Sequence, residues 1–322
     1  ELGKFVPAHR VEAACASGGL ALHNAINSIL SGQNNTVMVL GVEKMTDSNQ
    51  DEVTAGLMAA GSDEERQAGV TFPGIYALIA QAYMQKYGVS EELLAGVSVK
   101  NHYHGSLNSK AQYRKTITVE DVMKSGRIAD PLKLLDCSPI SDGASAVVIT
   151  NKEIRSKPVW ITASEIATDT LALHDRNSYT SLGSVVEASE KAYKKAGIKP
   201  SDVDVSEIHD CFSIAEAIAT EDLGFSKRGE GARDISKGKM TLGKASGPGG
   251  PLARRGKVVT NPSGGLKACG HPVGATGIKQ IVEITEQLRG IAGKRQVKGA
   301  KIGLTHNVGG SGAIAVIHIL QV

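Results

Sequence analysis

The sequence predicts a layered α/β fold built from two similar halves. Near its start the chain alternates strand, helix and strand, which is the order of a layered α/β arrangement. The order strand, cysteine, helix occurs twice, at Cys15 and at Cys211, and each half ends in an apolar strand. Two such halves packed together would bring the two cysteine turns to one interface.

The first half is predicted from three apolar segments. Val11–Ala14 predicts a short buried strand, and Ser17–Ser31 predicts a helix that Gly32 ends. Thr36–Val42 is a continuous apolar run, which is typical of a strand buried on both faces.

A more polar region then interrupts the first half. It predicts helices at Ile75–Tyr87 and Ser90–Tyr103, and the apolar strand Ala144–Thr150 follows it. We interpret this region as an insertion, or subdomain, that packs on the core.

The second half repeats the theme. The predicted strands are Val159–Ala163, Val203–Ile208, Lys301–Thr305 and Ala313–Leu320, and the predicted helices are Ser184–Ala196 and Ser213–Leu223. The last two strands would close as a pair around a glycine loop. Glycine clusters at Gly247–Gly250, Gly264–Gly277 and Gly309–Gly312 predict tight turns around a site.

The amino-acid composition excludes several classes of protein. The chain has 322 residues, of which 41% are hydrophobic and 21% charged, and it lacks an apolar run of transmembrane length. The net charge of +3 does not argue for nucleic acid, and it suits an anionic substrate. The four cysteines form no C-x-x-C pair, so we expect no metal site and no disulfide framework, and a reducing, cytoplasmic location.

Cys15 is the first candidate for chemistry. It lies between an apolar run and a helix of small residues, in V-E-A-A-C-A-S-G-G. Unpaired N–H groups at a helix N-terminus stabilise a thiolate, whereas most free cysteines are buried and inert packing residues. Gly18 and Gly19 would let a substrate or another backbone approach closely.

Three histidines follow strands or glycine turns, where side chains meet a substrate. His209 and Cys211 stand in H-D-C-F, His271 in G-H-P-V-G-A-T-G, and His306 before the last glycine loop. A histidine beside a cysteine activates the thiol as a nucleophile. Cys137, Cys269, His102 and His104 are interpreted as structural residues.

At these motifs the sequence resembles the thiolase family. The resemblance covers essentially the whole chain and also includes D-C-S-P-I-S-D-G-A and the terminal glycine loop. H-D-C-F in place of N-E-A-F resembles the sterol-carrier-type and archaeal branch. The resemblance implies a five-layer α-β-α-β-α sandwich of two halves, each with a mixed five-stranded sheet, and an inserted loop domain.

The implied domains are an N-terminal half, an inserted loop domain and a C-terminal half. The N-terminal half comprises residues 1–46 and 130–155, the loop domain residues 47–129 and the C-terminal half residues 156–322. Family members carry further residues before this point, so the resemblance predicts that the first half is incomplete at its start.

The resemblance also implies residue roles. Cys15 would attack a thioester and carry the acetyl group. His271 would take the Cys15 proton and help to hold the thioester oxygen during the Claisen chemistry. His209 stands where the family usually has the asparagine that holds an oxyanion-hole water. The backbone N–H groups of Cys15 and Val308 would form the other oxyanion hole, and Ser138 matches a serine that contacts the pantetheine of coenzyme A.

One departure from the family pattern concerns the carbon acid chemistry. Many thiolases carry their acid/base cysteine in the terminal glycine loop, where this chain has His306. The departure shifts proton transfer at the acetyl methyl carbon towards Cys211, with His306 as the alternative.

The implied function is an acetyl-CoA C-acetyltransferase, which reversibly condenses two acetyl-CoA to acetoacetyl-CoA and CoA. One alternative is a ketoacyl synthase-like condensing enzyme that decarboxylates a malonyl donor and needs no base for the methyl proton. A second alternative is a non-catalytic acyl-CoA- or lipid-binding or scaffold member.

Expected cofactors and partners follow from the same resemblance. We expect no tightly bound cofactor, with coenzyme A thioesters as substrates, and neither nucleic acid nor membrane as a partner. A homodimer or homotetramer is expected. The archaeal branch also implies an OB-fold zinc-ribbon protein that links the enzyme to a hydroxymethylglutaryl-CoA synthase of the mevalonate pathway.

Overall fold

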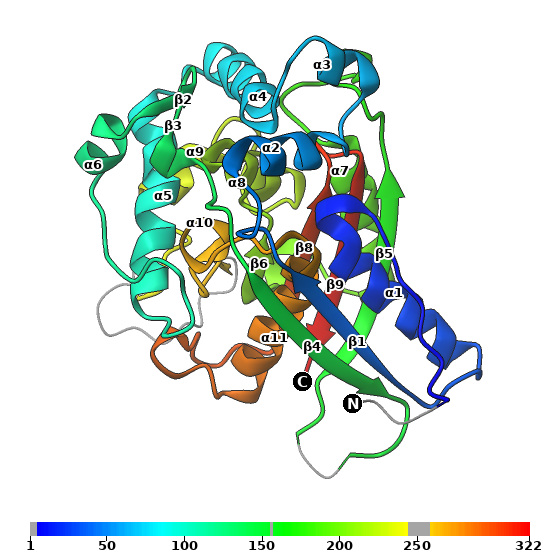
Figure 1. Ribbon diagram of the computed structural model, residues 1–322. Coiled ribbons are helices and arrows are strands. Elements are labelled where there is room, and N and C mark those ends of the chain that lie inside the picture. Colours follow the sequence, from blue (N-terminus) through cyan, green and yellow to red (C-terminus); the bar gives the residue numbers. More distant parts are fainter. Residues whose placement is uncertain (1–4, 155–156, 244–257) are drawn as a thin grey trace.

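Figure 1 shows the computed structural model, which describes residues 5–154, 157–243 and 258–322. The α-helices of this part are α1 (Ser17–Leu30), α2 (Gln50–Met58), α3 (Asp63–Gln67), α4 (Phe72–Tyr87), α5 (Glu91–Ser106), α6 (Val119–Lys124), α7 (Gly183–Ala196), α8 (Ser213–Asp222), α9 (Gly231–Ser236), α10 (Gly265–Cys269) and α11 (Thr276–Arg289). The strands are β1 (Thr36–Glu43), β2 (Arg127–Ala129), β3 (Leu132–Lys133), β4 (Gly143–Thr150), β5 (Trp160–Thr168), β6 (Val205–Ile208), β7 (Val259–Thr260), β8 (Ile302–Gly309) and β9 (Ile314–Gln321). The glycine cluster Gly247–Gly250 lies outside the described residues.

A mixed five-stranded sheet forms the centre of the second half. Its strand order is β5-β9-β8-β6-β7, with β6 parallel to β7 and β8, and β9 antiparallel to β8 and β5. The predicted closing pair of strands is confirmed by β8 and β9, which lie side by side at the core of the molecule (Figure 1). β6 ends at Ile208, which lies opposite His306 of β8, so the sheet places His209 beside His306.

β1 and β4, which the insertion separates in the sequence, form an antiparallel pair. Thr36 lies opposite Thr150 and Glu43 opposite Gly143, so segments far apart in the sequence share one ribbon (Figure 1). The prediction that Thr36–Val42 is buried on both faces is wrong for the described structure. Successive side chains of a strand point to opposite faces, and here one face packs against helices while alternate side chains are exposed: Met38, Leu40 and Val42.

The elements stack in layers. Helices α1 and α11 pack against each other, and they contact both the β1–β4 ribbon and the five-stranded sheet. Helix α7 covers β5 and β9. The described residues thus give four alternating layers of strands and helices. In this part of the chain no helix covers the exposed face of β1, where the family sandwich has its fifth layer.

The segment before Cys15 differs from the prediction. Val11–Ala14 forms no strand; the backbone is irregular and then enters a 3₁₀ turn, Ala14–Ala16. Side chains fix this turn locally, because the Glu12 carboxylate accepts from the Ala14 N–H at 2.8 Å and the Ser17 hydroxyl accepts from the Ala13 N–H at 2.8 Å. The turn leads directly into α1, whose predicted position is confirmed.

The polar region 47–129 contains α2 to α6, and α5 anchors it to the second half. Helix α5 packs against α8, α9 and α10. At this contact Lys100 and Glu216 form a fully buried ion pair, and Lys100 Nζ also donates to the Thr260 hydroxyl at 2.6 Å. The division into two halves and a loop domain stays a prediction from the sequence.

Candidate active site

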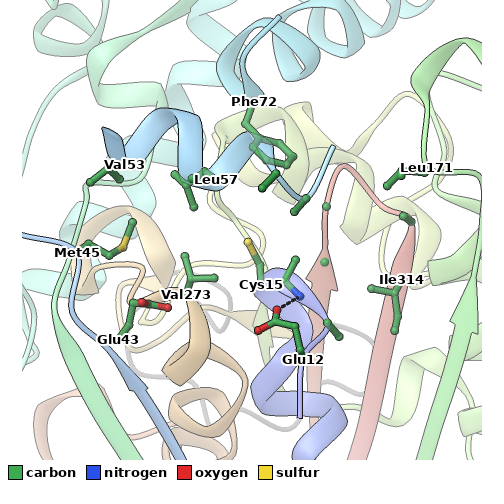
Figure 2. A pocket seen from close by; sticks show the side chains of 18 of the residues that line it. Glu12, Cys15, Glu43, Met45, Val53, Leu57, Phe72, Leu171, Val273 and Ile314 are labelled. Atoms are coloured by element: carbon green, nitrogen blue, oxygen red, sulfur yellow. Dashed lines mark hydrogen bonds between the residues drawn. The ribbon is translucent and has the colours of Figure 1, made fainter. Parts of the chain in front are cut away.

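Cys15 lies in a strained turn at the N-terminal end of α1. Ala14 has a φ of 50°, the left-handed region that L-residues rarely adopt, and Cys15 follows it in the 3₁₀ turn. Figure 2 shows its sulfur pointing into a pocket below Phe72 and Leu57. The turn therefore directs the thiol into the pocket and not into the packed interior beside α1.

Small residues let two segments, α11 and β8, approach the Cys15 turn closely. A Cβ added at Gly277 would collide with the Gly19 nitrogen and the Asn307 side chain, and one added at Gly309 would collide with the Ala13 carbonyl oxygen. The sequence left open whether Gly18 and Gly19 admit a substrate or another backbone. The structure shows another backbone, that of α11.

The structure brings three of the predicted side chains together. The thiol of Cys15 and one ring nitrogen each of His209 and His271 all lie within 4.8 Å of one another. The rings of His209 and His271 meet edge to face with centroids 5.0 Å apart. Both histidines are buried, and the three residues come from three segments distant in the sequence.

Thr276 fixes the tautomer of His271. The Thr276 hydroxyl donates to the Pro272 carbonyl oxygen at 3.0 Å, so its oxygen accepts the proton from His271 Nδ1 at 2.7 Å. Burial and the nearby Lys279 lower the pKa of His271 to about 3, which keeps the ring neutral. Nε2 of His271 therefore carries a free lone pair and can accept a proton.

Asn307 sets the opposite tautomer of His209. The Gly19 N–H donates to Asn307 Oδ1 at 3.1 Å, and Asn307 Nδ2 donates to the Cys15 carbonyl oxygen at 2.8 Å. These two bonds orient the amide so that Nδ2 also donates to His209 Nδ1 at 3.3 Å. Burial and the neighbouring His271 hold the pKa of His209 well below its usual value. The ring proton then sits on Nε2, which makes His209 a hydrogen-bond donor.

His306 contacts the same turn from β8. Its Nδ1 accepts from the His209 backbone N–H at 3.2 Å, and its Nε2 is buried without a partner among the described residues. Burial lowers the pKa of His306 to about 3. His306 thus supports the backbone of His209.

Cys211 is buried beside Tyr76. Tyr76 lies beside the Cys211 thiol and stacks on Phe212 with ring centroids 4.6 Å apart. Burial and the nearby Cys15 raise the pKa of Cys211. The thiol form of Cys211 is therefore the resting form, and it carries a proton that it can donate.

The segment that contains Ser138 contacts both the H-D-C-F motif and the His271 turn. The Ser138 N–H donates to the Cys211 carbonyl oxygen at 2.9 Å, and Cys137 forms a β-bridge with Phe212. A few residues on, the Ser141 hydroxyl accepts from the His271 N–H at 3.0 Å. This segment ties the His271 turn to the Cys211 turn.

Burial dominates the electrostatics of Cys15. It raises the pKa of the thiol to about 12, and the Glu43 and Glu12 carboxylates add to the rise, whereas a backbone hydrogen bond opposes it. The helix N-terminus therefore does not by itself lower the pKa of this thiol below its ordinary value. The resting thiol needs a base, and the free Nε2 of His271 fits that need.

The pocket in front of Cys15 has a volume of about 710 Å³. Apolar side chains line much of it, among them Met45, Val53, Leu57, Phe72, Leu171 and Val273 (Figure 2). Its polar rim includes Glu12, Glu43 and Lys44. The pocket is large enough for an acyl group and part of a carrier.

The sequence analysis missed Thr276, Asn307 and Tyr76. Two of them stand in motifs already singled out, since Thr276 is the last but one residue of G-H-P-V-G-A-T-G and Asn307 follows His306, whereas Tyr76 lies in no such motif. His104 matches its structural interpretation: its Nδ1 donates to the Asn261 carbonyl oxygen and its Nε2 accepts from the Leu242 N–H. Val308 lies in β8 between Asn307 and Gly309, against the Cys15 turn.

Two family descriptions match this chain. "Thiolase, N-terminal domain" matches residues 1–153, and "Thiolase C-terminal domain-like" matches residues 166–322.

Curated relatives cover nearly the whole chain. An acetyl-CoA acetyltransferase of Methanothermobacter thermautotrophicus is 49% identical over 98% of this chain and 80% of its own length. One of Methanocaldococcus jannaschii is 45% identical over the same shares. Sterol carrier protein 2 of Bos taurus is 35% identical over 97% of this chain and 58% of its own length.

Solved structures share the fold. An Ltp2-ChsH2(DUF35) aldolase superposes with a TM-score of 0.80 at 24% identity, over 95% of this chain and 78% of that chain. A monomeric SCP2-thiolase-like protein type 1 from Mycobacterium smegmatis superposes with a TM-score of 0.70 at 18% identity, over 96% of this chain and 61% of that chain. The thiolase-like α/β fold expected from the sequence is confirmed.

Proposed function

Because this chain belongs to the thiolase family, we propose that it is an acetyl-CoA C-acetyltransferase, which interconverts two acetyl-CoA with acetoacetyl-CoA and CoA through an acetyl-cysteine. The observation that carries the proposal is the meeting of Cys15 with a neutral histidine whose Nε2 is free. Coenzyme A thioesters are the substrates, and no step calls for a tightly bound cofactor.

In the thiolysis direction, His271 Nε2 takes the proton of Cys15 as the sulfur attacks the ketone carbonyl of acetoacetyl-CoA. The carbon–carbon bond breaks, Cys15 keeps the acetyl group, and the leaving acetyl-CoA carbanion takes the proton of Cys211. The raised pKa of Cys211 supports this role, because the thiol holds that proton in the resting enzyme.

The second half-reaction restores the site. The thiol of CoA attacks the acetyl-cysteine and passes its proton to the Cys211 thiolate. Cys15 leaves as a thiolate and takes the proton back from His271. Condensation of two acetyl-CoA is the exact reverse of these steps, so the same three groups serve both directions.

Two groups of donors would stabilise the oxyanions. His209 presents Nε2–H. This donor could bond the thioester oxygen of the acetyl-CoA carbanion directly or through a water molecule. The backbone N–H groups of Cys15 and Val308 would serve the acetyl-cysteine oxygen, and each such donor is typically worth about 3 kcal/mol. Ser138 would contact the pantetheine beside Cys211.

Thiolysis of acetoacetyl-CoA tests the proposal. We expect Cys15→Ser to lose the activity, while the matched variant Cys269→Ser keeps it. Full activity of Cys15→Ser would sink the proposal. Tight binding of acetyl-CoA without turnover by the unmodified chain would favour the non-catalytic alternative.

The malonyl-using alternative is tested separately. A decarboxylating enzyme needs no base for the methyl proton, so condensation from a malonyl thioester but not from acetyl-CoA would favour it. The buried Cys211 thiol, whose raised pKa keeps its proton in place, supports the acetyl-CoA reaction instead.

Partners and location extend the proposal. None of the described helices is long and apolar enough to cross a membrane. A cytoplasmic homodimer or homotetramer in the mevalonate pathway, linked through an OB-fold zinc-ribbon protein to hydroxymethylglutaryl-CoA synthase, is proposed from the resemblance. Native mass spectrometry tests the assembly: an exclusively monomeric chain would contradict the homo-oligomer, and homo-oligomers that never take up the zinc-ribbon protein would contradict that link.

A further inference from the structure

We propose that Cys15, His209 and His271 form a three-donor site for a thiophilic divalent cation, with Zn²⁺ as the physiological candidate, and that binding there reversibly blocks the nucleophile. The sequence contained no C-x-x-C pair and predicted no metal site. The donors are instead assembled by the fold from three distant segments, so spacing along the chain could not reveal them.

The donor set suits zinc in number and kind. One thiolate and two imidazole nitrogens are ligands that Zn²⁺ prefers, and three protein ligands leave a fourth position open. Tetrahedral zinc with its usual bond lengths places such donors about 3.3–3.6 Å apart. The three atoms here lie within 4.8 Å of one another, so side-chain rotations that move each donor atom by about an ångström would complete the site.

His271 is prepared to act as a ligand. Its Nδ1–H is donated to the Thr276 hydroxyl, which leaves Nε2 free and fixes the ring orientation. Histidine ligands of metals nearly always donate their other ring N–H in this way.

Charges of both signs surround the site: Lys279, which lowers the pKa of His271, opposes a cation, whereas two carboxylates favour one. Glu12 and Glu43 line the same pocket as Cys15, and Lys44 at its rim is paired with Asp47 and Asp142. The pocket also gives the fourth position access to water or another small ligand.

His209 limits the affinity. Its Nδ1 accepts from Asn307 Nδ2, and coordination through either ring nitrogen would cost this contact. If Nδ1 binds the metal, the lone pair is no longer offered to Asn307, and if Nε2 binds it, Nδ1 must carry the proton. This cost favours a reversible inhibitory site over a permanent structural one.

Binding replaces the S–H bond of Cys15 by a Zn–S bond and releases one proton to the buffer. No oxidation occurs, so a chelator such as EDTA restores the free thiol without a reductant.

Cobalt substitution tests the site on the protein alone, without any substrate. Co²⁺ is expected to give the visible absorption of a tetrahedral ion and a thiolate-to-cobalt charge-transfer band, and added Zn²⁺ should abolish both. Cys15→Ser should lose the charge-transfer band. His209→Ala and His271→Ala should each weaken Co²⁺ binding at least about tenfold, which is the lower end of what losing a supporting partner of a metal ligand costs. The matched controls Cys269→Ser and His23→Gln should keep the bands.

A second measurement needs no variant. Zn²⁺ should protect Cys15 from iodoacetamide, as mapped by peptide mass spectrometry, and EDTA should remove the protection. Unchanged labelling of Cys15 at saturating Zn²⁺, or cobalt bands that survive in Cys15→Ser, would overturn the inference. Either failure would leave the proposed acetyl transfer untouched, because neither experiment measures it.

Discussion

At the residue scale, the two histidines of the site are neutral and hold their protons on opposite nitrogens. Thr276 places the His271 proton on Nδ1, and Asn307 places the His209 proton on Nε2. One ring can therefore accept a proton while the other donates a hydrogen bond. Under the proposed function, this difference would make His271 the base and His209 the oxyanion donor.

Thr276→Val tests the tautomer assignment. Valine keeps the shape but removes the acceptor for His271 Nδ1–H, so the free lone pair is no longer fixed on Nε2. We expect the rate of Cys15 acetylation to fall about 100-fold, which is at the lower end of a general base contribution. Thr276→Ser should keep most of the rate. Equal rates for Thr276→Val and the unmodified chain, measured by single-turnover kinetics, would refute the assignment.

The raised pKa of Cys15 makes a prediction about pH. Because the pKa is about 12, only a small fraction of the thiol is ionised near neutrality, and that fraction grows about tenfold per pH unit. Alkylation of Cys15 by iodoacetamide without substrate should therefore accelerate about tenfold per unit from pH 7 to 9. A rate that is already level over this range would show a standing thiolate instead.

The sequence singled out the residues that meet at the site more readily than the residues that orient them. Cys15, Cys211 and His271 stand out because cysteine and histidine beside glycine turns have few structural explanations. Thr276 and Asn307 carry no such signal, since their roles depend on orientation across elements. For Cys15 the sequence shows the helix N-terminus, which favours a thiolate, but not the burial, which raises the pKa of the thiol.

At the element scale, close backbone packing sets the position of the Cys15 turn. The N-terminal ends of α1 and α11 meet where Gly18, Gly19 and Gly277 leave no room for a Cβ. The sequence predicted α1, α4, α5, α7 and α8 and the long strands, whereas the short elements α2, α3, α9, β2, β3 and β7 were not predicted. Val11–Ala14 failed because an apolar run of this length forms a strand only where a partner strand pairs with it.

Gly277→Ala tests the packing of the two helices. The added Cβ would collide with the Gly19 nitrogen and with Asn307, so the helices must separate. We expect a loss of about 1–3 kcal/mol in the free energy of unfolding, together with a lower rate of Cys15 acetylation. Chemical denaturation and a single-turnover assay measure both. Gly126→Ala is the matched control, because its Cβ would meet open space; similar losses in both variants would contradict the account.

At the scale of the whole molecule, the site forms where the β1–β4 half, the polar insertion and the five-stranded half meet. Cys15 comes from the first, Tyr76 from the second, and His209, Cys211 and His271 from the third. The sequence predicted that two cysteine turns would meet, since it repeats strand, cysteine and helix. It could not predict that α5 is anchored to the second half, because Lys100 and Glu216 resemble ordinary surface charges.

Lys100→Met tests that anchor. The Lys100 side chain is 2% exposed, and its removal would leave the Glu216 carboxylate buried without its cation. We expect the free energy of unfolding to fall by about 3–5 kcal/mol. Lys110→Met is the control, because Lys110 is 69% exposed in its pair with Glu286, and its loss should cost less than about 1 kcal/mol. Equal effects in a denaturant titration would argue against a structural role for the buried pair.

The central claim is that Cys15 carries the acetyl group, and peptide mass spectrometry after incubation with acetyl-CoA tests it most directly. We predict a single acetyl adduct that maps to Cys15, disappears on addition of CoA and is absent from Cys15→Ser. An adduct on Cys211 or Cys269, or a chain that turns over substrate while Cys15 stays unmodified, would contradict the claim.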